Sequence, residues 1–329
     1  MKRFACILIF TLGVARVEQV PAAEKSETRP APSKTIKFAP RLTKGDRFVL
    51  ELTAGSARNG RPEMAGIKVL QVIDVEIMGD KKNILFGWTV RNTGGIGPDA
   101  KPATLPPQVA GLMSACDGVK MIFELSPDYK RIGLKNFKQI KALMSKAIEK
   151  TLADMDKSPQ AKATLWKVMS TMLASREAIE QFCQRGISLL LTLAGLELER
   201  EGGSATESDW ELPMPFGGGA LPGKRMARVV FLEQTAGQAM VSSNSKMDHK
   251  KAAKAFLATM KVLAKKLNQP APTEKDIPNI DMWEVSSFVV DLKTNLPRSA
   301  ARKLTLMMGK NKQTQTLTLV LKKNQEPKK

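Results

Sequence analysis

The sequence predicts an α+β fold, in which a curved, half-barrel-like antiparallel sheet carries a helical insertion and one further amphipathic helix. The apolar pattern changes period twice: it alternates from residue 48 to 125, repeats about every 3.6 residues from 136 to 200, and then mostly alternates again. Single strands and helices do not alternate, as they would in a parallel sheet. We therefore expect the strands before and after the helical block to join in one sheet.

The chain begins with the pattern of an export signal. Basic residues at 2–3 precede the eleven-residue apolar run Phe4–Val14, and small residues follow at Ala22 and Ala23. A membrane span needs about 20 apolar residues. We expect a signal peptide at 1–22, cleavage near Ala22 or Ala23, an exported protein that is periplasmic or extracellular, and no transmembrane span in the mature chain.

The mature chain is expected to be strongly basic. The full sequence has a formal charge of +20, and residues 1–22 contain three basic and one acidic residue, so about +18 remains after cleavage. Such a charge attracts anionic polymers and anionic lipid surfaces. Aromatic residues are only 5% of the sequence and are not interleaved with the lysines, as they are in single-strand nucleic-acid grooves. We expect an anionic polymer or lipid surface as partner, and no nucleic acid.

The first ordered elements are expected to be strands. Residues 23–43 are rich in proline and polar residues and are predicted to be a mobile leader, followed by a single α+β domain over 44–325. Four segments then show period-two alternation. The expected strands are 48–53, 67–78, 84–90 and 119–125.

A helical insertion is predicted over residues 136–200, where the apolar residues form stripes. The apolar run Ile187–Leu198 is expected to be a buried helix, because twelve residues are too few to cross a membrane. Methionine suits both irregular cores and surfaces that accept varied apolar ligands. Core packing and a ligand cleft therefore both remain open for the candidate cleft residues. These are Met144, Ile148, Met169, Met172 and Phe182.

The strand pattern resumes at residue 209 and is interrupted by a predicted amphipathic helix over 248–267. One side of this helix is apolar and the other carries lysines, which fits either packing on the sheet or a basic face directed to a membrane or an anionic polymer. The lysines of this stripe are Lys250, Lys254, Lys261 and Lys265. The remaining expected strands are 209–212, 225–233, 239–243, 283–292, 303–308 and 313–321.

No motif assembles a catalytic or metal site. Gly218–Arg225 has the spacing of a phosphate-binding loop, but Arg225 stands where a Ser or Thr must bind magnesium, and a strand pattern follows. His249 is the only histidine, so zinc ligand sets and nucleophile–base pairs lack members. Asp74 and Glu76 share one strand face, as a glycosidase-like pair of carboxylates would, but such residues more often mark the wet side of a sheet. We expect no cofactor, no metal and no enzymatic activity.

Two cysteines, Cys116 and Cys183, remain after the signal peptide. An oxidising compartment permits them to form a disulfide if their Cα atoms are close enough. A reactive thiol needs an electropositive, partly exposed setting, which the sequence does not show. A disulfide and a pair of buried thiols both remain open.

Four segments carry a resemblance to a known group of proteins: Gly45-Asp46-Arg47-Phe48, Phe123–Asp128, Asp209-Trp210 and Val290–Pro297. They resemble bacterial exported proteins of unknown function, similar in outline to the half-barrel carriers that move lipoproteins or lipids across the periplasm. The resemblance implies a curved sheet whose helices close its concave side and shelter an acyl chain. It identifies no binding residue.

The expected function is therefore that of a non-enzymatic envelope protein, which binds an apolar or lipid-like ligand in a cleft between sheet and helices. The alternative is a structural or interaction module that binds anionic polymers or membrane surfaces through its basic face.

Overall fold

A computed structural model describes residues 35–79, 84–126, 129, 132–154, 159, 162–163, 166, 173, 176–200, 203–213, 220–233, 235–266, 270–274 and 279–322. Its strands are β1 Thr35–Lys37, β2 Arg47–Arg58, β3 Arg61–Pro62, β4 Lys68–Ile77, β5 Ile84–Ile96, β6 Pro102–Ala103, β7 Lys120–Leu125, β8 Ile132–Leu134, β9 Glu197–Glu199, β10 Thr206–Pro213, β11 Ala220–Glu233, β12 Gln238–Met247, β13 Ile280–Asp291, β14 Leu296–Met308 and β15 Asn311–Lys322. Its helices are α1 Pro107–Met113, α2 Phe137–Ala153, α4 Arg176–Cys183, α5 Arg185–Leu190 and α6 His249–Lys266, with a 3₁₀ turn at Met64–Gly66.

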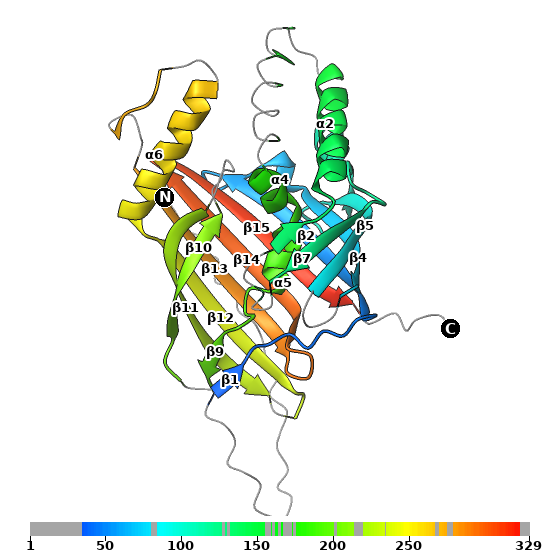
Figure 1. Cartoon of the computed structure of the whole chain (residues 1–329), viewed down its shortest axis with the longest axis vertical. Coiled ribbons are helices and arrows are strands. Elements are labelled where there is room, and N and C mark those ends of the chain that lie inside the picture. The colour runs from blue at the N-terminus through cyan, green and yellow to red at the C-terminus, as the bar shows by residue number, and fades with distance from the viewer. Residues whose placement is uncertain are drawn as a thin grey trace, which may run out of the picture. The chain divides into compact units, whose positions relative to one another are not determined.

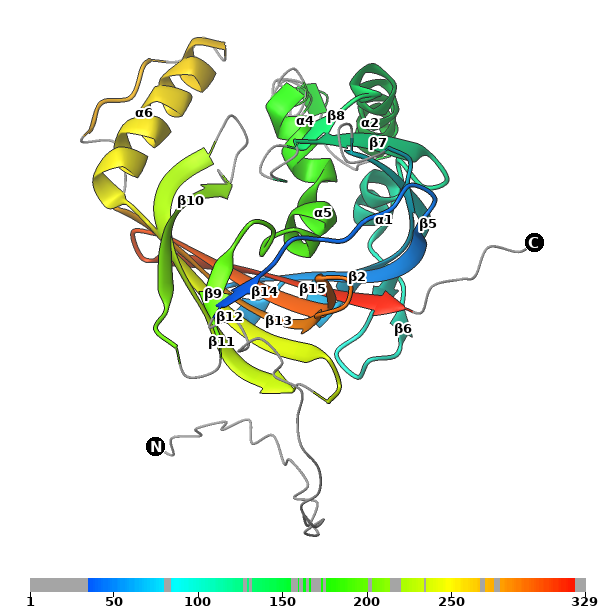
Figure 2. The same cartoon turned by 60° about the horizontal axis from the view of Figure 1, so that its bottom comes forward.

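Thirteen of the strands form one antiparallel sheet, which curves around the helices (Figures 1 and 2). Eleven of them follow one another from β10 through β15, then β2, β4, β5 and β7 to β8, while β3 and β6 pair with β2 and β5. The bonded pair β15 and β2 joins the strands that follow the helical block to those that precede it. This confirms the predicted α+β class with a curved antiparallel sheet.

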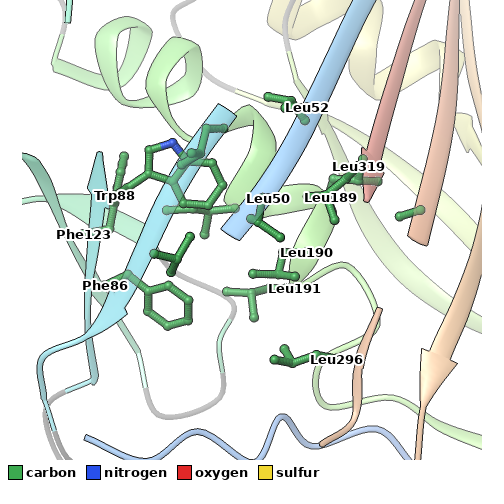
Figure 3. Packing of buried hydrophobic residues seen from close by; sticks show 14 of the residues in the cluster. Leu50, Leu52, Phe86, Trp88, Phe123, Leu189, Leu190, Leu191, Leu296 and Leu319 are labelled. Carbon is green, nitrogen blue, oxygen red and sulfur yellow. The ribbon is translucent and has the colours of Figure 1, made fainter. Parts of the chain in front are cut away.

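The main core lies between the concave face of the sheet and α2, α4 and α5. Strands β2, β5 and β7 contribute Leu50, Phe86 and Phe123, all at 0% exposure. Helix α5 and the turn after it add leucines at 189–191, which lie near Leu50 in Figure 3. The buried face of α2 repeats at the helical spacing that the sequence predicted, as Ile140, Met144, Ile148 and Leu152.

A second cluster of buried residues, the α6 core, lies where α6 packs on the strands. Its members are Leu221, Met247, Ala252, Phe256, Ile280, Met282 and Leu306. The alternation of side chains places the members from β11 to β14 on the same sheet face as the main core. Figure 2 shows α6 and the α2–α4–α5 group on this concave side.

The prediction of one helix over Ile187–Leu198 is wrong in its second half. Helix α5 ends at Leu190, a turn follows, and Glu197–Glu199 forms β9 against β1. Gly195 has a φ of +79° in this turn and donates its N–H to the Phe38 carbonyl oxygen at 2.7 Å. The apolar run is continuous because α5, the leucines of the turn after it and Leu198 of β9 are all buried.

The expected leader 23–43 contributes to the fold from Thr35 onward. Strand β1 lies in this segment, and Phe38 next to it is 0% exposed within the main core. The Phe38 N–H donates to Leu196 O at 2.8 Å, and Tyr129 Oη donates to Pro40 O at 3.2 Å. Proline content did not reveal this ordering, because it depends on partners far away in the sequence. The predicted signal peptide at 1–22 lies outside the described residues.

Candidate functional site

The concave face of β11–β14 changes from apolar to polar and back to apolar along the strands. On β13 the inward-facing sequence runs Met282, Glu284, Ser286 and Phe288. The polar side chains form two adjacent cross-strand rows, here called the charged band. One row is Arg225, Ser245 and Glu284, and the other is Ser243, Ser286 and Arg302.

The charged band is almost fully buried between the main core and the α6 core. Arg225 is 5% exposed, Glu284 is 3% and Ser286 is 1%. Burying a charge is costly unless it is paired and hydrogen-bonded. The charged band is therefore a candidate functional site.

Arg225 is held from two sides. Its guanidinium lies 4.0 Å from the centre of the Trp210 ring, and its Nη1 donates to the Thr192 carbonyl oxygen at 2.7 Å, in the turn after α5. Desolvation lowers the pKa of Arg225 to about 10, although the negative charge of Glu284 acts to raise it. The side chain therefore stays positively charged at neutral pH.

Glu284 is the carboxylate of the charged band. It accepts a hydrogen bond from Ser286 Oγ at 3.2 Å, while Arg302 Nε lies 3.9 Å from its other oxygen. That second distance exceeds a normal hydrogen bond, so the ion pair is loose. Glu284 thus compensates the arginines only in part.

A third arginine comes from the helical side. Arg185 begins α5 and has an exposed side chain, yet desolvation lowers its pKa and the positive charge of Arg302 lowers it further. Its guanidinium lies 5.2 Å from the centre of the Phe182 ring. Within the described residues, Arg225 and Arg302 thus share the carboxylate of Glu284, and Arg185 lies close enough to Arg302 for their charges to repel.

A cavity of about 420 Å³ adjoins the α6 core. It lies between α6, the ends of β11–β13 and the segment that leads into β13. Its apolar lining includes Leu221, Met247, Phe256, Leu257 and Ile280. It is lined further by Ala252, Ala253, Lys250, Lys254, His249, Glu274 and Asn279.

This cavity and the charged band share one sheet face. Met247 and Ser245 are two residues apart on β12, and Leu221 and Arg225 are four apart on β11. At a strand rise of 3.2–3.4 Å per residue, the larger of these separations is about 13 Å.

A second, more open hollow of about 350 Å³ lies over the convex face of the sheet. Its outward-facing lining is mostly polar, with Thr53, Ser287, Lys303, Thr316 and Thr318, and includes the apolar Val285 and Ala301. Ser286 and Arg302 of the charged band are also among its lining residues, although their side chains alternate with the outward-facing ones.

Three of the five predicted cleft residues belong to the part of the chain that the structure describes. Met144 and Ile148 are 4% and 2% exposed inside the main core, and Phe182 packs partly buried against it. None of the three lines either cavity described above. Met169 and Met172 lie outside the described residues.

Sequence reasoning missed the charged band, although part of its signal is present in the sequence. Glu284 and Arg302 occupy positions whose neighbours two residues away are buried, such as Met282 and Ala300. A charge at an inward-facing position of an alternating strand is the detectable sign. The sequence did single out Arg225, as part of the string Gly218–Arg225 that resembles a phosphate-binding loop. Residues Ala220–Arg225 of that string lie within β11, and no helix directly follows them.

The lysine stripe of α6 is exposed, as its amphipathic pattern indicates. Lys250, Lys254, Lys261 and Lys265 all lie in exposed positions. His249 at the start of α6 has Nδ1 3.2 Å from the Ile280 carbonyl oxygen.

Cys116 and Cys183 are free thiols in this structure, each packed partly buried against the main core. Desolvation raises the pKa of Cys116 to about 11 and that of Cys183 to about 12, and Cys116 adds to the second shift. Both thiols are therefore protonated, and poorly nucleophilic, at neutral pH.

The carboxylates Asp74 and Glu76 form ion pairs on the outer side of β4. Glu76 accepts from Lys120 Nζ and Arg47 Nη2, each at 2.7 Å, and these contacts lower its pKa. Asp74 pairs with Arg91 at 2.8 Å. Their surroundings are those of the solvated side of a sheet.

Within the described part of the chain, no three His, Cys, Asp or Glu side chains gather closely enough to hold a metal ion. No helix among the described residues combines the length and the apolar character needed to cross a membrane.

No protein-family model matches the chain, and no curated protein sequence matches it either. Among solved structures, it is similar to a lipovitellin structure described as "lipid–protein interactions in lipovitellin", with a TM-score of 0.43 and 14% sequence identity. The match covers 86% of this chain and 26% of the lipovitellin chain, so this chain spans about a quarter of that protein's length.

Proposed function

We propose that this protein binds an apolar, lipid-like molecule on the concave side of its sheet, in the cavity beside α6. The observation that carries the proposal is the cavity itself, about 420 Å³ in volume, with Leu221, Met247 and Phe256 among its walls. Small-molecule sites in proteins are mostly apolar hollows of about 300–1,000 Å³ with a few polar groups. The N-terminal export pattern supports a periplasmic or extracellular setting for this binding, and we infer a binding rather than a catalytic role.

The experiment is displacement of a neutral fluorescent probe, N-phenyl-1-naphthylamine, combined with native mass spectrometry of protein purified from its own host. We expect saturable probe binding and a co-purifying lipid mass. Ala253 lines the cavity and Ala258 is an exposed residue of the same helix that does not. Ala253→Phe should therefore weaken probe binding at least about tenfold by filling the cavity, while Ala258→Phe leaves it unchanged. Equal binding by both variants, or none by the unaltered protein, contradicts the proposal.

The basic stripe of α6 favours a second candidate function, binding to anionic polymer or an anionic membrane surface. Its four lysines are exposed, and the formal charge of the chain is +20. Replacing all four by glutamine should weaken retention on heparin and on phosphatidylglycerol vesicles. Because salt screens such contacts over a few Å, retention should also fall steeply by about 0.5 M salt. Retention that is unchanged in the variant excludes this stripe as the site.

A further inference from the structure

The charged band contains more positive charge than its own acidic group can compensate. Arg225 and Arg302 lie on adjoining rows of the band, whose one carboxylate is Glu284, and Arg185 of α5 lies close enough to Arg302 for their charges to repel. Its contact with Arg302, at 3.9 Å, is loose. A buried excess of cationic groups is unfavourable unless an anion enters, which makes the band complementary to a negatively charged ligand.

The band also presents hydrogen-bond donors in one small area. Arg225 Nε, Ser245 Oγ and Trp210 Nε1 are buried atoms without a hydrogen-bond partner among the described residues. Arg225 and Ser245 are direct cross-strand neighbours, so their side chains leave the same sheet face with Cα atoms about 4.5–5.5 Å apart. At 5% and 3% exposure, neither residue can satisfy its donor with bulk water.

The guanidinium of Arg225 is positioned in advance. Trp210 covers one of its faces at 4.0 Å, and the Thr192 carbonyl oxygen takes one of its N–H groups. A guanidinium has five N–H donors arranged as a planar fork, which matches the two oxygens of a carboxylate or a phosphate. The remaining donors can therefore bind an anion without reorganisation of the side chain.

Apolar surface borders the band on both sides. The α6 core and its cavity lie toward the start of β13, and the main core begins with Phe288 four residues beyond Glu284. The cavity wall at Leu221 is about 13 Å from Arg225 along the strand. An amphiphile is thus long enough to reach from the cavity to the band, which a free inorganic ion is not.

We propose that the charged band binds the anionic end of an amphiphile, a carboxylate or phosphate group, and that Glu284 is the internal counter-ion with which this end competes. This inference rests on the proposed function and specifies the ligand class for the same concave face. Arg225 and Ser245 donate to the anion, and Arg302 and Arg185 supply the surrounding positive potential.

The test compares four probes by displacement and isothermal titration: oleate, lysophosphatidic acid, methyl oleate and inorganic phosphate. The unaltered protein should bind oleate or lysophosphatidic acid about tenfold or more tightly than methyl oleate, because a bidentate charged contact is lost in the ester. The better of the two anions identifies the head group. Inorganic phosphate should bind far more weakly, since it lacks the apolar part.

The variants separate the anionic contact from the apolar one. Arg225→Met should remove the preference for oleate over methyl oleate and leave methyl oleate binding unchanged, and Glu284→Gln should strengthen oleate binding several-fold. Arg228→Met is the matched control, because Arg228 is exposed on the opposite face of the same strand. Circular dichroism checks that each variant is folded. If Arg225→Met does not fold, the other two variants test the proposal. Ser245→Ala should weaken oleate binding, and Glu284→Gln should strengthen it.

The failures are distinguishable. Equal affinity for oleate and methyl oleate overturns the assignment of the band but leaves the proposed function standing. Failure of both to displace the probe overturns the proposed function. If inorganic phosphate binds as tightly as oleate, the proposal of an amphiphilic ligand is also contradicted, because the apolar part then contributes nothing to the affinity.

Discussion

Gly186 allows α5 to approach the sheet closely, because a Cβ atom at this position would lie 2.7 Å from Cζ2 of the buried Trp88 ring. Gly186→Ala gains about 1 kcal/mol of helix propensity and incurs about 1–3 kcal/mol of overpacking. We expect a net loss of up to about 2 kcal/mol in urea unfolding. Gly133→Ala, where the same Cβ meets open space, is the control, and equal stability of the two variants would refute this account.

Only part of the charged band could be predicted from the sequence. The inward position of Glu284 could be read from the sequence, because Met282 and Phe288 define the buried side of β13. Its neighbours could not, since the register that places Ser245 opposite Glu284 joins two strands that α6 separates in the sequence. Whether a residue is buried can be predicted from its neighbours in the sequence. Which charged residues come together depends on the pairing of strands that lie far apart in the sequence.

At the scale of elements, the β13–β14 hairpin depends on one carboxylate. Asp291 accepts the N–H of Lys293 at 2.8 Å and an N–H from Arg298 Nη2 at 2.8 Å. Although desolvation opposes the change, these hydrogen bonds lower the pKa of Asp291. Asp291→Ala should lower the free energy of unfolding by about 1–3 kcal/mol at pH 7.

The same carboxylate gives a pH dependence with a defined sign. The folded-state pKa of Asp291 lies below its unfolded value of about 3.9, so its contribution is complete well above that pH and disappears as pH falls through the folded value. The stability difference between the unaltered protein and Asp291→Ala should therefore narrow below about pH 4. Urea titrations at a series of pH values measure it, and a difference that grows on acidification would contradict the assignment.

The longer elements were predictable and the shorter ones were not. Strands such as β13 alternate over twelve residues, so local pattern suffices, whereas β1 and β9 are three-residue strands that exist because they pair with each other. Strand β5 continues to Ile96 through glycines that a propensity reading would exclude. Gly95 is required there, since a Cβ would lie 2.3 Å from the Ala103 carbonyl oxygen.

At the scale of the whole sheet, the two cores cannot unfold separately without breaking shared strands. Strand β13 places Met282 in the α6 core and Phe288 in the main core, and β14 does the same with Leu306 and Ala300. Because the strands are continuous through the charged band, loss of either core removes support from the other. The described sheet is thus expected to behave as one cooperative unit.

Phe256→Ala tests this coupling from the α6 side, where Phe256 is 7% exposed. Truncating a buried phenylalanine costs about 3–5 kcal/mol, and this loss should shift one single unfolding transition. Hydrogen exchange should accelerate in β13 and also in β2, on the far side of β14 and β15. Met226→Ala, at a side chain 50% exposed on the convex face of β11, should change stability by less than about 0.5 kcal/mol. Two separate transitions, with only the earlier one moved by Phe256→Ala, would show instead that the charged band divides the sheet into independent halves.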